Sequence, residues 1–556
     1  MRIDLIWMTS TGSRAPEWPA GETVRVARTL DALATVRPRR AQYVLFWDEE
    51  LGPPDEAAIV AAAGLPGDVW HAGLRLGMAG LPRAIDCVDP VWRFNRDPGC
   101  DVVATSWRMS LRACLVRASV LERLGGPNPH FETLAGAALE LGHRWIKRGA
   151  LMRHVPALLP ETIGPFDPLT MPLDDELRFL RLAYGKMWML WAAGRLLGRG
   201  TELSRLIRGL RRSGVPAIAA PVNLHEPDAG PASSMSSNGR APRAATSANT
   251  VSVLIPTLDR YPYLLDLLAH LRQQSVSPLE IVVIDQTAPD RRETGWPARF
   301  ADLPLQVIIR EQPGQSSARN AGLHAVRGDV VLLLDDDDVV PPDLIACHLA
   351  FMDRFAVDAS CGVVLEPGSG PLLPDFGFTR DSDVFPTNNA MLRMAALPGS
   401  GLFDLAFERG ERADHDLGMR LYLSGALLGL NPAASVTHLH APRGGLREHR
   451  ARVVTRSASR ASLRTRHILS DTEAYLWARY FTKQQVEEAL LIRTAGTLRG
   501  DRQGAARIIR ALVMLLLLPD TLRRNRSALA RGKAMLNDYP QIPAPEPSAR
   551  LETVAV

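Results

Sequence analysis

Strand-like and helical segments alternate between residues 251 and 334, and this alternation limits the fold more than any other feature. The strand-like runs are Val251–Ile255, Ile281–Ile284, Leu305–Ile309 and Val330–Leu334, and the helical stretches are Tyr261–Gln274 and Ser316–Val326. The strand-like runs are continuously apolar, which is typical of a parallel sheet covered on both faces. Ligands of such sheets bind beyond the carboxyl ends of the strands, so chemistry is expected directly after each strand.

Acidic residues follow two of these strands. Asp285 comes directly after the second strand, and four consecutive aspartates, at 335–338, come after the fourth. Adjacent carboxylates repel one another, and a divalent cation that prefers oxygen ligands, Mg²⁺ or Mn²⁺, offsets that repulsion. The alternative is an acidic turn ahead of Pro341, because acidic runs are usually solvated. The position at the carboxyl end of a strand favours the cation site.

Three segments resemble the opening of a family 2 glycosyltransferase with the GT-A fold: VSVLIPTLDR, EIVVIDQTAPD and GQSSARNAGLHAVRGDVVLLLDDDDVVPPD. The resemblance implies that Asp285 contacts the nucleotide base of a nucleotide-diphosphate sugar. It also implies that the D-x-D pair, Asp335 and Asp337, serves the ribose and a metal ion. The family's frequent second Asp is Gln286 here, so the resemblance does not identify the base. The implied donor-binding residues are Pro256, Asp285, Arg319, Asn320, Asp335 and Asp336, and the implied metal ligands are Asp337 and His438.

A further segment, GLFDLAFERGERADHDLGMRLYLSGA, resembles the acceptor side of the same family. Asp414 falls on the family's catalytic-base position, and Asp416 is the second candidate. An inverting transfer needs one carboxylate to take the proton of the acceptor hydroxyl while a metal holds the departing diphosphate. The alternative is that Asp414 is only an acid in the first turn of a helix, where the helix dipole favours it.

Two histidines in SVTHLH, His438 and His440, point to one face of a strand because side chains alternate along it. The resemblance implies that His438 completes the metal shell, and a histidine without a metal is the open alternative. The Q-x-x-R-W element of processive polysaccharide synthases is absent from the sequence. Its absence favours the transfer of a single sugar.

These segments predict an inverting, metal-dependent glycosyltransferase of the hexosyltransferase type that uses Mg²⁺ or Mn²⁺. The resemblance implies a nucleotide-diphosphate sugar donor, a glycan or lipid-linked acceptor, and a role in bacterial cell-surface polysaccharide biosynthesis. The alternatives are a non-catalytic sugar- or nucleotide-binding scaffold and a sugar nucleotidyltransferase. The latter requires a Gly-rich triphosphate loop after the first strand, and IPTLDRYPY has none. With 65 Lys and Arg against 60 Asp and Glu, the net charge of +5 is too small over 556 residues to indicate a nucleic-acid partner.

The first half of the chain contains a second, weaker copy of the same pattern. Leu141–Ala157 aligns without gaps on Leu417–Ala433, and Val44–Glu56 aligns without gaps on Leu332–Leu344. Both matches occur in the same order, so the first half also resembles a GT-A domain. We therefore expect an α/β protein with a Rossmann-like GT-A domain in the C-terminal half, a truncated GT-A-like domain in the N-terminal half, and helical appendages.

The N-terminal copy is expected to have lost its chemistry. In these alignments, continued at the same spacing, Asp414 corresponds to Ala138 and Asp335 corresponds to Trp47. A shift of one residue would pair Asp335 with Asp48 instead, but it would break the match between the Pro-Pro pairs. The N-terminal copy is also shorter by about one strand–helix–strand unit, which would include any equivalent of the base-binding aspartate. This half should not transfer sugars. A scaffold, an acceptor-glycan binder and a dimerisation module are the open alternatives, and a metal on the acids at 48–50 is the weaker expectation.

These features predict six segments. They are a degenerate GT-A-like domain (1–165), a helical appendage (166–213), a flexible linker (214–250), the catalytic GT-A domain (251–450), a C-terminal helical region (451–540) and a tail (541–556). The linker is rich in Pro, Gly, Ser and Ala and has no periodic apolar face, which is typical of a flexible tether.

The sequence predicts a cytoplasmic protein, and contact with the inner face of the cell membrane is an open alternative. The N-terminal MRIDLIWMTSTGS is unlike a signal peptide, and the five cysteines include no C-x-x-C pair. The longest apolar run, Ala511–Leu518, has eight residues, against the roughly twenty of a membrane-spanning helix. Basic residues beside this run could seat residues 508–536 on an anionic membrane. An ordinary amphipathic helix that closes the domain is the stronger expectation.

Overall fold

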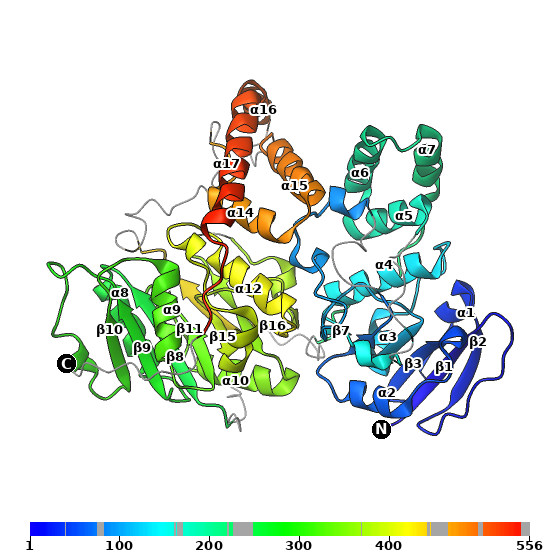
Figure 1. The fold of residues 1–556 in the computed structure, drawn as a ribbon, viewed down its shortest axis with the longest axis horizontal. Helices are drawn as coiled ribbons and strands as arrows, with labels where there is room; N and C mark the ends of the chain where they lie inside the picture. The colour runs from blue at the N-terminus through cyan, green and yellow to red at the C-terminus, as the bar shows by residue number, and fades with distance from the viewer. Residues whose placement is uncertain are drawn as a thin grey trace. The chain divides into compact units, whose positions relative to one another are not determined.

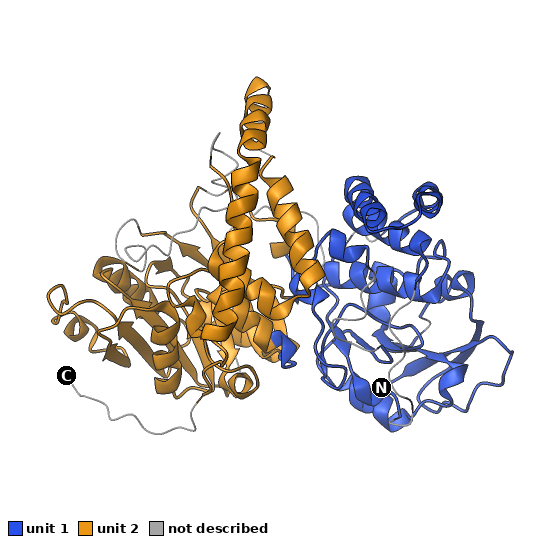
Figure 2. Ribbon diagram, turned by 45° about the horizontal axis from the view of Figure 1, so that its top comes forward, with its two compact units in different colours: residues 1–236, 378–381, 422–427 blue, residues 237–377, 382–421, 428–556 orange. Residues whose placement is uncertain are grey.

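The computed structural model describes residues 1–38, 40–74, 83–160, 163, 171–219, 222–225, 248–368, 370–441, 445, 465–498 and 504–545. The chain forms two compact units, which are coloured separately in Figure 2. Unit 1 consists of residues 1–236, 378–381 and 422–427, and unit 2 consists of residues 237–377, 382–421 and 428–556. Most of the expected linker, residues 226–247, lies outside the described residues.

Unit 2 is built on one mixed sheet with the strand order β10-β9-β8-β11-β15-β13-β16-β12 (Figure 1). Strands β10, β9, β8 and β11 run parallel, β15 runs antiparallel to both of its neighbours, and β16 runs parallel to β13. The bounds are β8 Val251–Thr257, β9 Glu280–Asp285, β10 Leu305–Ile309, β11 Val330–Leu333, β12 Asp338–Val339, β13 Ala359–Leu365, β15 Ala390–Arg393 and β16 Leu428–His438. The predicted parallel sheet is confirmed for its first four strands.

Helices cover this sheet because each of them presents apolar side chains to it. In α8 (Tyr261–Leu271) the buried leucines recur at helical spacing. Helix α9 (Gln315–Ala325) comes close to β8 at Gly322, where a Cβ would lie 2.1 Å from the Leu254 side chain. Helix α10 (Leu344–Phe355) packs on β13 and β16. The carboxyl ends of β8, β9 and β11 therefore meet at one edge of the sheet.

Unit 1 contains a second mixed sheet with the order β2-β1-β3-β6-β4-β7-β5. Strands β2, β1 and β3 are parallel, β6 is antiparallel to β3 and β4, and β7 is parallel to β4. The bounds are β1 Ile3–Thr9, β2 Thr23–Ala27, β3 Tyr43–Asp48, β4 Val69–His71, β5 Ala104–Thr105, β6 Ala113–Arg117, β7 Met152–His154, α3 Ala118–Leu124 and α4 Leu134–Lys147. From β2 to β7, the directions repeat those of β9, β8, β11, β15, β13 and β16 in unit 2.

Backbone hydrogen bonds show the same repeat independently of residue identity. The Arg117 N–H donates to the carbonyl of Asp68 in unit 1, and the Arg393 N–H donates to the carbonyl of Asp358 in unit 2, both at 2.9 Å. Arg117 ends β6 and Arg393 ends β15, the strands that occupy the same place in the two sheets. The first of the two sequence alignments, continued toward the N-terminus at the same spacing, also pairs these two arginines. The repeat expected from the sequence is therefore present in the fold.

One detail of the expected alignment is wrong. The strand registers match Val44 of β3 to Val331 of β11, one position earlier than the sequence alignment does. Asp335 therefore corresponds to Asp48 and not to Trp47. Hydrogen bonds between strands fix the register of the two sheets. Unit 2 has one more residue than unit 1 between this strand and the following Pro-Pro pair, so an alignment made on the prolines is one residue off in the strand.

The strand that was expected to be missing from unit 1 is present. β2 pairs with β1 as β9 pairs with β8, and by register Ala27 stands where unit 2 has Asp285. Residues 10–22, all of them described, contain no helix between β1 and β2. Among its described residues, unit 1 lacks the counterpart of α8 and of the edge strand β10, together with the base-binding carboxylate.

Each unit ends in a group of helices. Those of unit 1 are α5 (Leu173–Tyr184), α6 (Lys186–Gly198) and α7 (Leu203–Arg212), and those of unit 2 are α14 (Asp471–Tyr480), α15 (Lys483–Gly496), α16 (Ala505–Leu516) and α17 (Leu518–Asp538). Gly532 lets α17 pack closely on α14, because a Cβ there would lie 2.6 Å from the Cβ of Ala474. None of the described helices combines the length and the apolar composition that crossing a bilayer requires.

Acid should destabilise unit 1 through its buried histidines. Burial lowers the pKa of His71 and of His143 to about 3, and that of His154 to about 4. These imidazoles stay neutral in the folded state, whereas in the unfolded chain they take up a proton near pH ~6.5. Their contribution to stability is therefore fully present above pH ~6.5. It is lost as the pH falls toward about 4, by ~1.4 kcal/mol per pH unit for each histidine.

Denaturant unfolding of the full chain between about pH 7 and pH 5 checks this expectation. Tryptophan fluorescence reports mainly on unit 1, which contains nine of the eleven tryptophans. His143→Gln should reduce the pH dependence, and substitution of the exposed His130 by Gln should leave it unchanged. A pH dependence that is the same in His143→Gln as in the wild type would contradict the prediction.

Candidate functional site

The last three of the four consecutive aspartates are buried at the carboxyl end of β11, each with 3 % or less of its surface exposed. The first, Asp335, accepts a hydrogen bond of 2.7 Å from Nη2 of Arg319 on α9. Asp336 accepts hydrogen bonds from Oγ1 of Thr257 at 2.8 Å and from Nη1 of Arg260 at 3.0 Å. Burial with charge compensation of this kind is not a property of a solvated turn. Asp336, Asp337 and Asp338 therefore do not form the solvated acidic face that the acidic-turn alternative assumes.

Asp337 has one carboxylate oxygen that accepts no hydrogen bond. Its Oδ2 accepts a hydrogen bond of 2.7 Å from the Ala441 N–H, while its Oδ1 is buried and accepts no hydrogen bond. Nδ1 of His438 lies 3.5 Å from this Oδ1, and Nη1 of Arg260 lies 3.3 Å from it. The pairing of β12 with the end of β16 brings His438 to this position. The two side chains expected to bind a metal thus lie next to each other.

The pKa values of this cluster reflect burial and mutual charge. Burial would lower the pKa of His438, but its 3.0 Å hydrogen bond to Asp338 and the charges of the aspartates outweigh burial and raise the pKa to about 9. Burial raises the pKa of Asp336 to about 7, although Arg260 opposes the shift. The carboxylates therefore hold one imidazolium and one guanidinium close to their oxygens.

The donor atoms fit a divalent cation. Mg²⁺ and Mn²⁺ prefer oxygen ligands, and Mg²⁺ is usually bound by one or two protein carboxylates together with phosphate oxygens of a substrate. The buried oxygen of Asp337, without a hydrogen bond and beside an imidazole, supplies such a partial shell. Within the described ranges, no three His, Cys, Asp or Glu side chains form a complete metal cage. A substrate that brings its own oxygens would complete the shell.

Asp285 ends β9, and two donors hold its carboxylate. Oδ1 accepts a hydrogen bond from the Thr287 N–H at 2.9 Å, and Oδ2 accepts one from the Tyr261 hydroxyl at 2.7 Å. The neighbouring Gln286 accepts a 2.7 Å hydrogen bond at Oε1 from the Gly314 N–H. Gln286 therefore connects the loop after β9 to the start of α9. Asp285, at the end of β9, is the acidic side chain at the start of this loop.

The other expected donor-binding residues lie on β8 and α9. Pro256 is half-buried near the end of β8. Asn320 exchanges two hydrogen bonds of 2.8 Å with the backbone of Phe403. Its amide is thereby engaged in holding α9 to the acceptor-side segment, whereas Arg319 reaches the aspartates directly.

Asp414 stands in the first turn of α12 (Ala413–Leu423), with 36 % of its side chain exposed. Its Oδ1 lies 3.0 Å from Nδ1 of His415. Loss of contact with water would raise the pKa of Asp414, but the charge and hydrogen bond of His415 and the charge of Arg412 outweigh it, so the pKa falls well below its usual range. The carboxylate is ionised and reachable from solvent, as a proton acceptor must be.

Asp416, the second candidate, is fully buried and engaged. Its Oδ2 accepts hydrogen bonds from Nε and Nη2 of Arg420 at 3.0 and 2.7 Å, and its Oδ1 accepts one from a tyrosine hydroxyl of α14 at 2.6 Å. Unit 1 has the same ion pair at the aligned positions, where Nε of Arg144 donates to Glu140 at 2.7 Å. Unit 1 lacks Asp414 but retains this ion pair, so Asp416 is a structural acid.

Sequence reasoning missed three residues of the site, which are Arg260, Tyr261 and Glu408. Arg260 contacts two aspartates, and Tyr261 holds Asp285. Glu408 accepts hydrogen bonds from two N–H groups at the start of α9. Arg260 and Tyr261 follow the first strand closely, so the rule that chemistry lies directly after each strand could have found them. No comparable signal marks Glu408.

Backbone strain is concentrated at this site. Among the described residues, four that are not glycine have a positive φ, and three of these flank the site: Asp259 (57°), Arg412 (81°) and His440 (54°). Each lies within two residues of a side chain described above. Such conformations cost free energy and persist where the surrounding contacts enforce them, as at ligand-binding sites.

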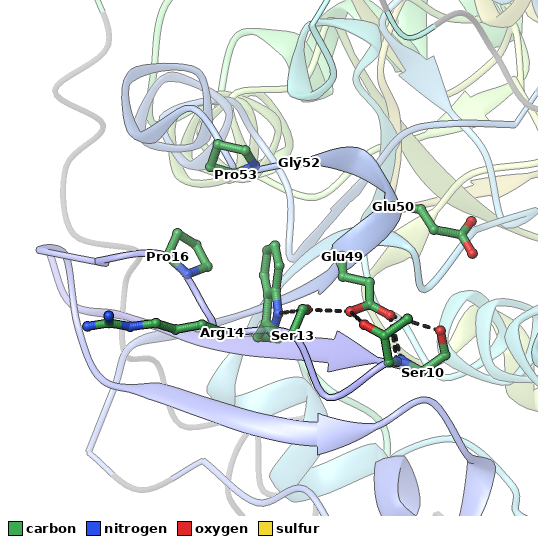
Figure 3. A pocket seen from close by; sticks show the side chains of 10 residues that line it. Ser10, Ser13, Arg14, Pro16, Glu49, Glu50, Gly52 and Pro53 are labelled. Carbon is green, nitrogen blue, oxygen red and sulfur yellow. Dashed lines mark hydrogen bonds between the residues drawn. The ribbon is translucent and has the colours of Figure 1, made fainter.

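The corresponding place in unit 1 is a pocket of about 530 Å³ (Figure 3). Asp48 is buried between Arg28 and Arg112, at 3.2 and 3.0 Å, and the same two arginines bind Glu50. Glu49 accepts hydrogen bonds from hydroxyl and N–H groups of residues 9–13. All six carboxylate oxygens of this cluster are engaged, counting the Glu50 N–H on Asp48. Unit 1 therefore has no open oxygen for a metal here.

Comparison with known proteins identifies the domain that carries the carboxylates. Among solved structures, S. aureus TarS 1–349 in complex with UDP has a TM-score of 0.33 and 19 % identity over 49 % of this chain and 72 % of that chain. The mannosyltransferase PcManGT from Pyrobaculum calidifontis, in complex with GDP-Man and Mn²⁺, has a TM-score of 0.31 and 18 % identity over 54 % and 81 %. Residues 252–375 match the family model described as Glycosyl transferase family 2. The matched residues lie in unit 2 and include the four consecutive aspartates.

Curated relatives are also glycosyltransferases by name. The uncharacterized glycosyltransferase YwdF of Bacillus subtilis is 35 % identical over 95 residues, which cover 16 % of this chain and 34 % of that protein. The putative glycosyltransferase EpsH of the same organism is 28 % identical over 138 residues, covering 25 % and 38 %. The chain thus spans about a third of the length of the curated relatives that it matches.

Substitutions in α12 should show that protein stability depends on the buried Asp416 and not on the half-buried Asp414. Asp416→Asn leaves Arg420 buried without its partner charge, so the free energy of unfolding should fall by about 3–5 kcal/mol. Asp414→Asn removes an exposed carboxylate and should cost about 1 kcal/mol or less. Denaturant unfolding followed by circular dichroism measures both, and Glu140→Gln in unit 1 is the matched control for loss of the pair. Equal stability of the Asp416 and Asp414 variants would refute the structural role of Asp416.

Proposed function

We propose that unit 2 is an inverting, metal-dependent glycosyltransferase of the hexosyltransferase type. It transfers one sugar from a nucleotide-diphosphate sugar to a glycan or lipid-linked acceptor. The proposal depends chiefly on Asp337, whose buried Oδ1 accepts no hydrogen bond and lies beside His438 and Arg260. This oxygen stands at the carboxyl end of a strand, where sheets of this kind bind nucleotides.

The parts of the donor are assigned to groups at this edge of the sheet. Asp285, oriented by Tyr261 and Thr287, accepts hydrogen bonds from the nucleotide base. Asp335 is held in place by Arg319 and accepts hydrogen bonds from the ribose. Guanidinium groups suit diphosphate oxygens because they offer several N–H donors in one plane. Arg260, bound to Asp336, is the guanidinium already present among the aspartates.

Asp337 would hold Mg²⁺ or Mn²⁺, and His438 would join it once its imidazolium has given up its proton, because only a neutral imidazole binds a metal ion. When bound, the cation neutralises the charge that develops on the departing diphosphate. Arg260 compensates the aspartates in the free protein, since its Nη1 lies 3.0 Å from Asp336 and 3.3 Å from Asp337. The site is therefore preorganised before the donor arrives.

Asp414 is the base of the proposed transfer. Its carboxylate is ionised at neutral pH, and its half-buried side chain, 36 % exposed, lets an acceptor hydroxyl reach it. The carboxylate takes the proton of the acceptor hydroxyl as the oxygen attacks the sugar from the face opposite the diphosphate. Asp416 cannot serve, because its two oxygens are engaged by Arg420 and Tyr480.

The setting proposed for this reaction is the cytoplasm, at the inner face of the cell membrane, in the synthesis of a bacterial cell-surface polysaccharide. The relatives are named as glycosyltransferases, which supports the class of reaction, and the setting follows from the sequence resemblance. The scaffold alternative fits unit 1, where every oxygen of the acidic cluster is engaged, but not unit 2. A nucleotidyltransferase is disfavoured because the loop after β8 contains no Gly-rich triphosphate-binding sequence.

Turnover of a panel of nucleotide sugars by the full chain with Mn²⁺ tests the proposal. Asp414→Asn should lower turnover by about 10²–10⁴-fold while donor binding is retained, because only proton transfer is lost. Asp337→Ala should lower turnover and also weaken metal-dependent donor binding. Glu50→Gln changes the residue that corresponds to Asp337 in unit 1, and it should leave turnover unchanged.

The outcomes separate the alternatives. If neither Asp337→Ala nor Asp414→Asn lowers turnover of the best donor, the proposed mechanism is wrong. If donors bind but none is turned over, unit 2 is a scaffold. A loss in Glu50→Gln equal to that in Asp337→Ala would show that unit 1 takes part in the reaction.

A further inference from the structure

Helix α16 presents its apolar side to solvent. Five of its large apolar side chains are between 51 % and 83 % exposed: Ile508, Ile509, Leu512, Leu515 and Leu516. With 3.6 residues per turn, these five fall on an arc of about 120°. The buried side chains, Arg510 and Met514, lie on the opposite side of the helix. The stronger sequence expectation, an ordinary helix that closes the domain, is therefore wrong for α16, because such a helix would bury this arc.

The helices at the end of unit 1 have a similar surface. On α6 and α7 five more large apolar side chains are at least 40 % exposed: Met187, Leu190, Leu197, Leu203 and Ile207. Those on α6 follow one another at helical spacing and form a stripe. Together α6, α7 and α16 hold ten of the twenty large hydrophobic side chains exposed among the described residues. The exposed apolar surface is therefore concentrated on the helical appendages.

We infer that these helices bind the protein to the surface of an anionic lipid bilayer. The charges beside the apolar side chains are complementary to such a surface. Helix α7 carries four arginines and no acidic residue, and α16 contains no acidic residue either. Apolar side chains enter the boundary between headgroups and acyl chains, and the neighbouring arginines contact the lipid phosphates. The inference rests on this surface and not on the function proposed above.

A lipid surface fits these helices better than a second copy of the chain. In a symmetric dimer the same patch meets itself, so the arginines of α7 would face their own copies. The arc on α16 is one helix wide and contains five side chains, whereas stable interfaces use roughly 20–30 residues per partner. A bilayer accepts a narrow apolar arc, because only the apolar side of an interfacial helix is inserted.

Co-sedimentation of the full chain with vesicles tests the inference. Vesicles of phosphatidylcholine with roughly a third phosphatidylglycerol should bind the protein, and pure phosphatidylcholine should bind it several-fold less. The triple variant Ile508→Ser, Leu512→Ser, Leu516→Ser should lower the partition coefficient by about tenfold or more. It replaces exposed side chains, so circular dichroism should show an unchanged fold. Arg205→Gln with Arg208→Gln should reduce the preference for anionic vesicles and its sensitivity to salt.

A matched control is available in unit 2, where Leu372 and Leu373 are exposed outside the helices. Leu372→Ser with Leu373→Ser removes exposed apolar surface of the same kind, although less of it, and should leave vesicle binding unchanged. The inference is overturned if the wild type does not bind anionic vesicles or if the triple variant binds as well as the wild type. A wild-type dimer that the triple variant converts to a monomer, seen by light scattering, would identify a second copy as the partner instead.

Discussion

Burying several carboxylates side by side is the most costly local feature of this fold, and the surrounding structure compensates it. In unit 2 the compensation comes from Arg260, Arg319 and His438, which belong to three different parts of the chain. They converge because β11 lies beside β8 and because β12 pairs with the end of β16. The sheet order therefore determines which cations reach the aspartates. A change in topology would leave buried charges without partners.

In unit 1 the acids of the corresponding cluster are also compensated, and each of their carboxylate oxygens accepts a hydrogen bond. The Thr9 hydroxyl donates to Glu49 as the Thr257 hydroxyl donates to Asp336, and the strand registers place these pairs at corresponding positions. Two arginines then bind both of the remaining acids of unit 1. In unit 2, Asp337 retains one oxygen without a hydrogen bond. A carboxylate oxygen that accepts no hydrogen bond, rather than the number of acids, distinguishes the candidate site from its copy.

The parallel strands of unit 2, the acids at their ends and the repeat could all be predicted from patterns of apolar residues and short identities. The correspondence of Asp48 with Asp335 could not, because hydrogen bonds between strands set the register and no residue identity records it. The orientation of α16 could not be predicted either. Its apolar residues recur as they would in a helix that closes a core, and only the packing of Arg510 and Met514 shows which side faces the protein.

The repeat also separates structural acids from the proposed catalytic one within a single chain. Arg144 and Arg420 each bind an acid four residues earlier, at Glu140 and Asp416, and each also donates to a backbone carbonyl 20 residues earlier. This arrangement anchors the helix in both units, so it reflects folding. The position two residues before the acid is alanine in unit 1 and Asp414 in unit 2. Because the ion pair already anchors α12, Asp414 is not needed for that purpose, and its half-buried carboxylate is available for the proposed proton transfer.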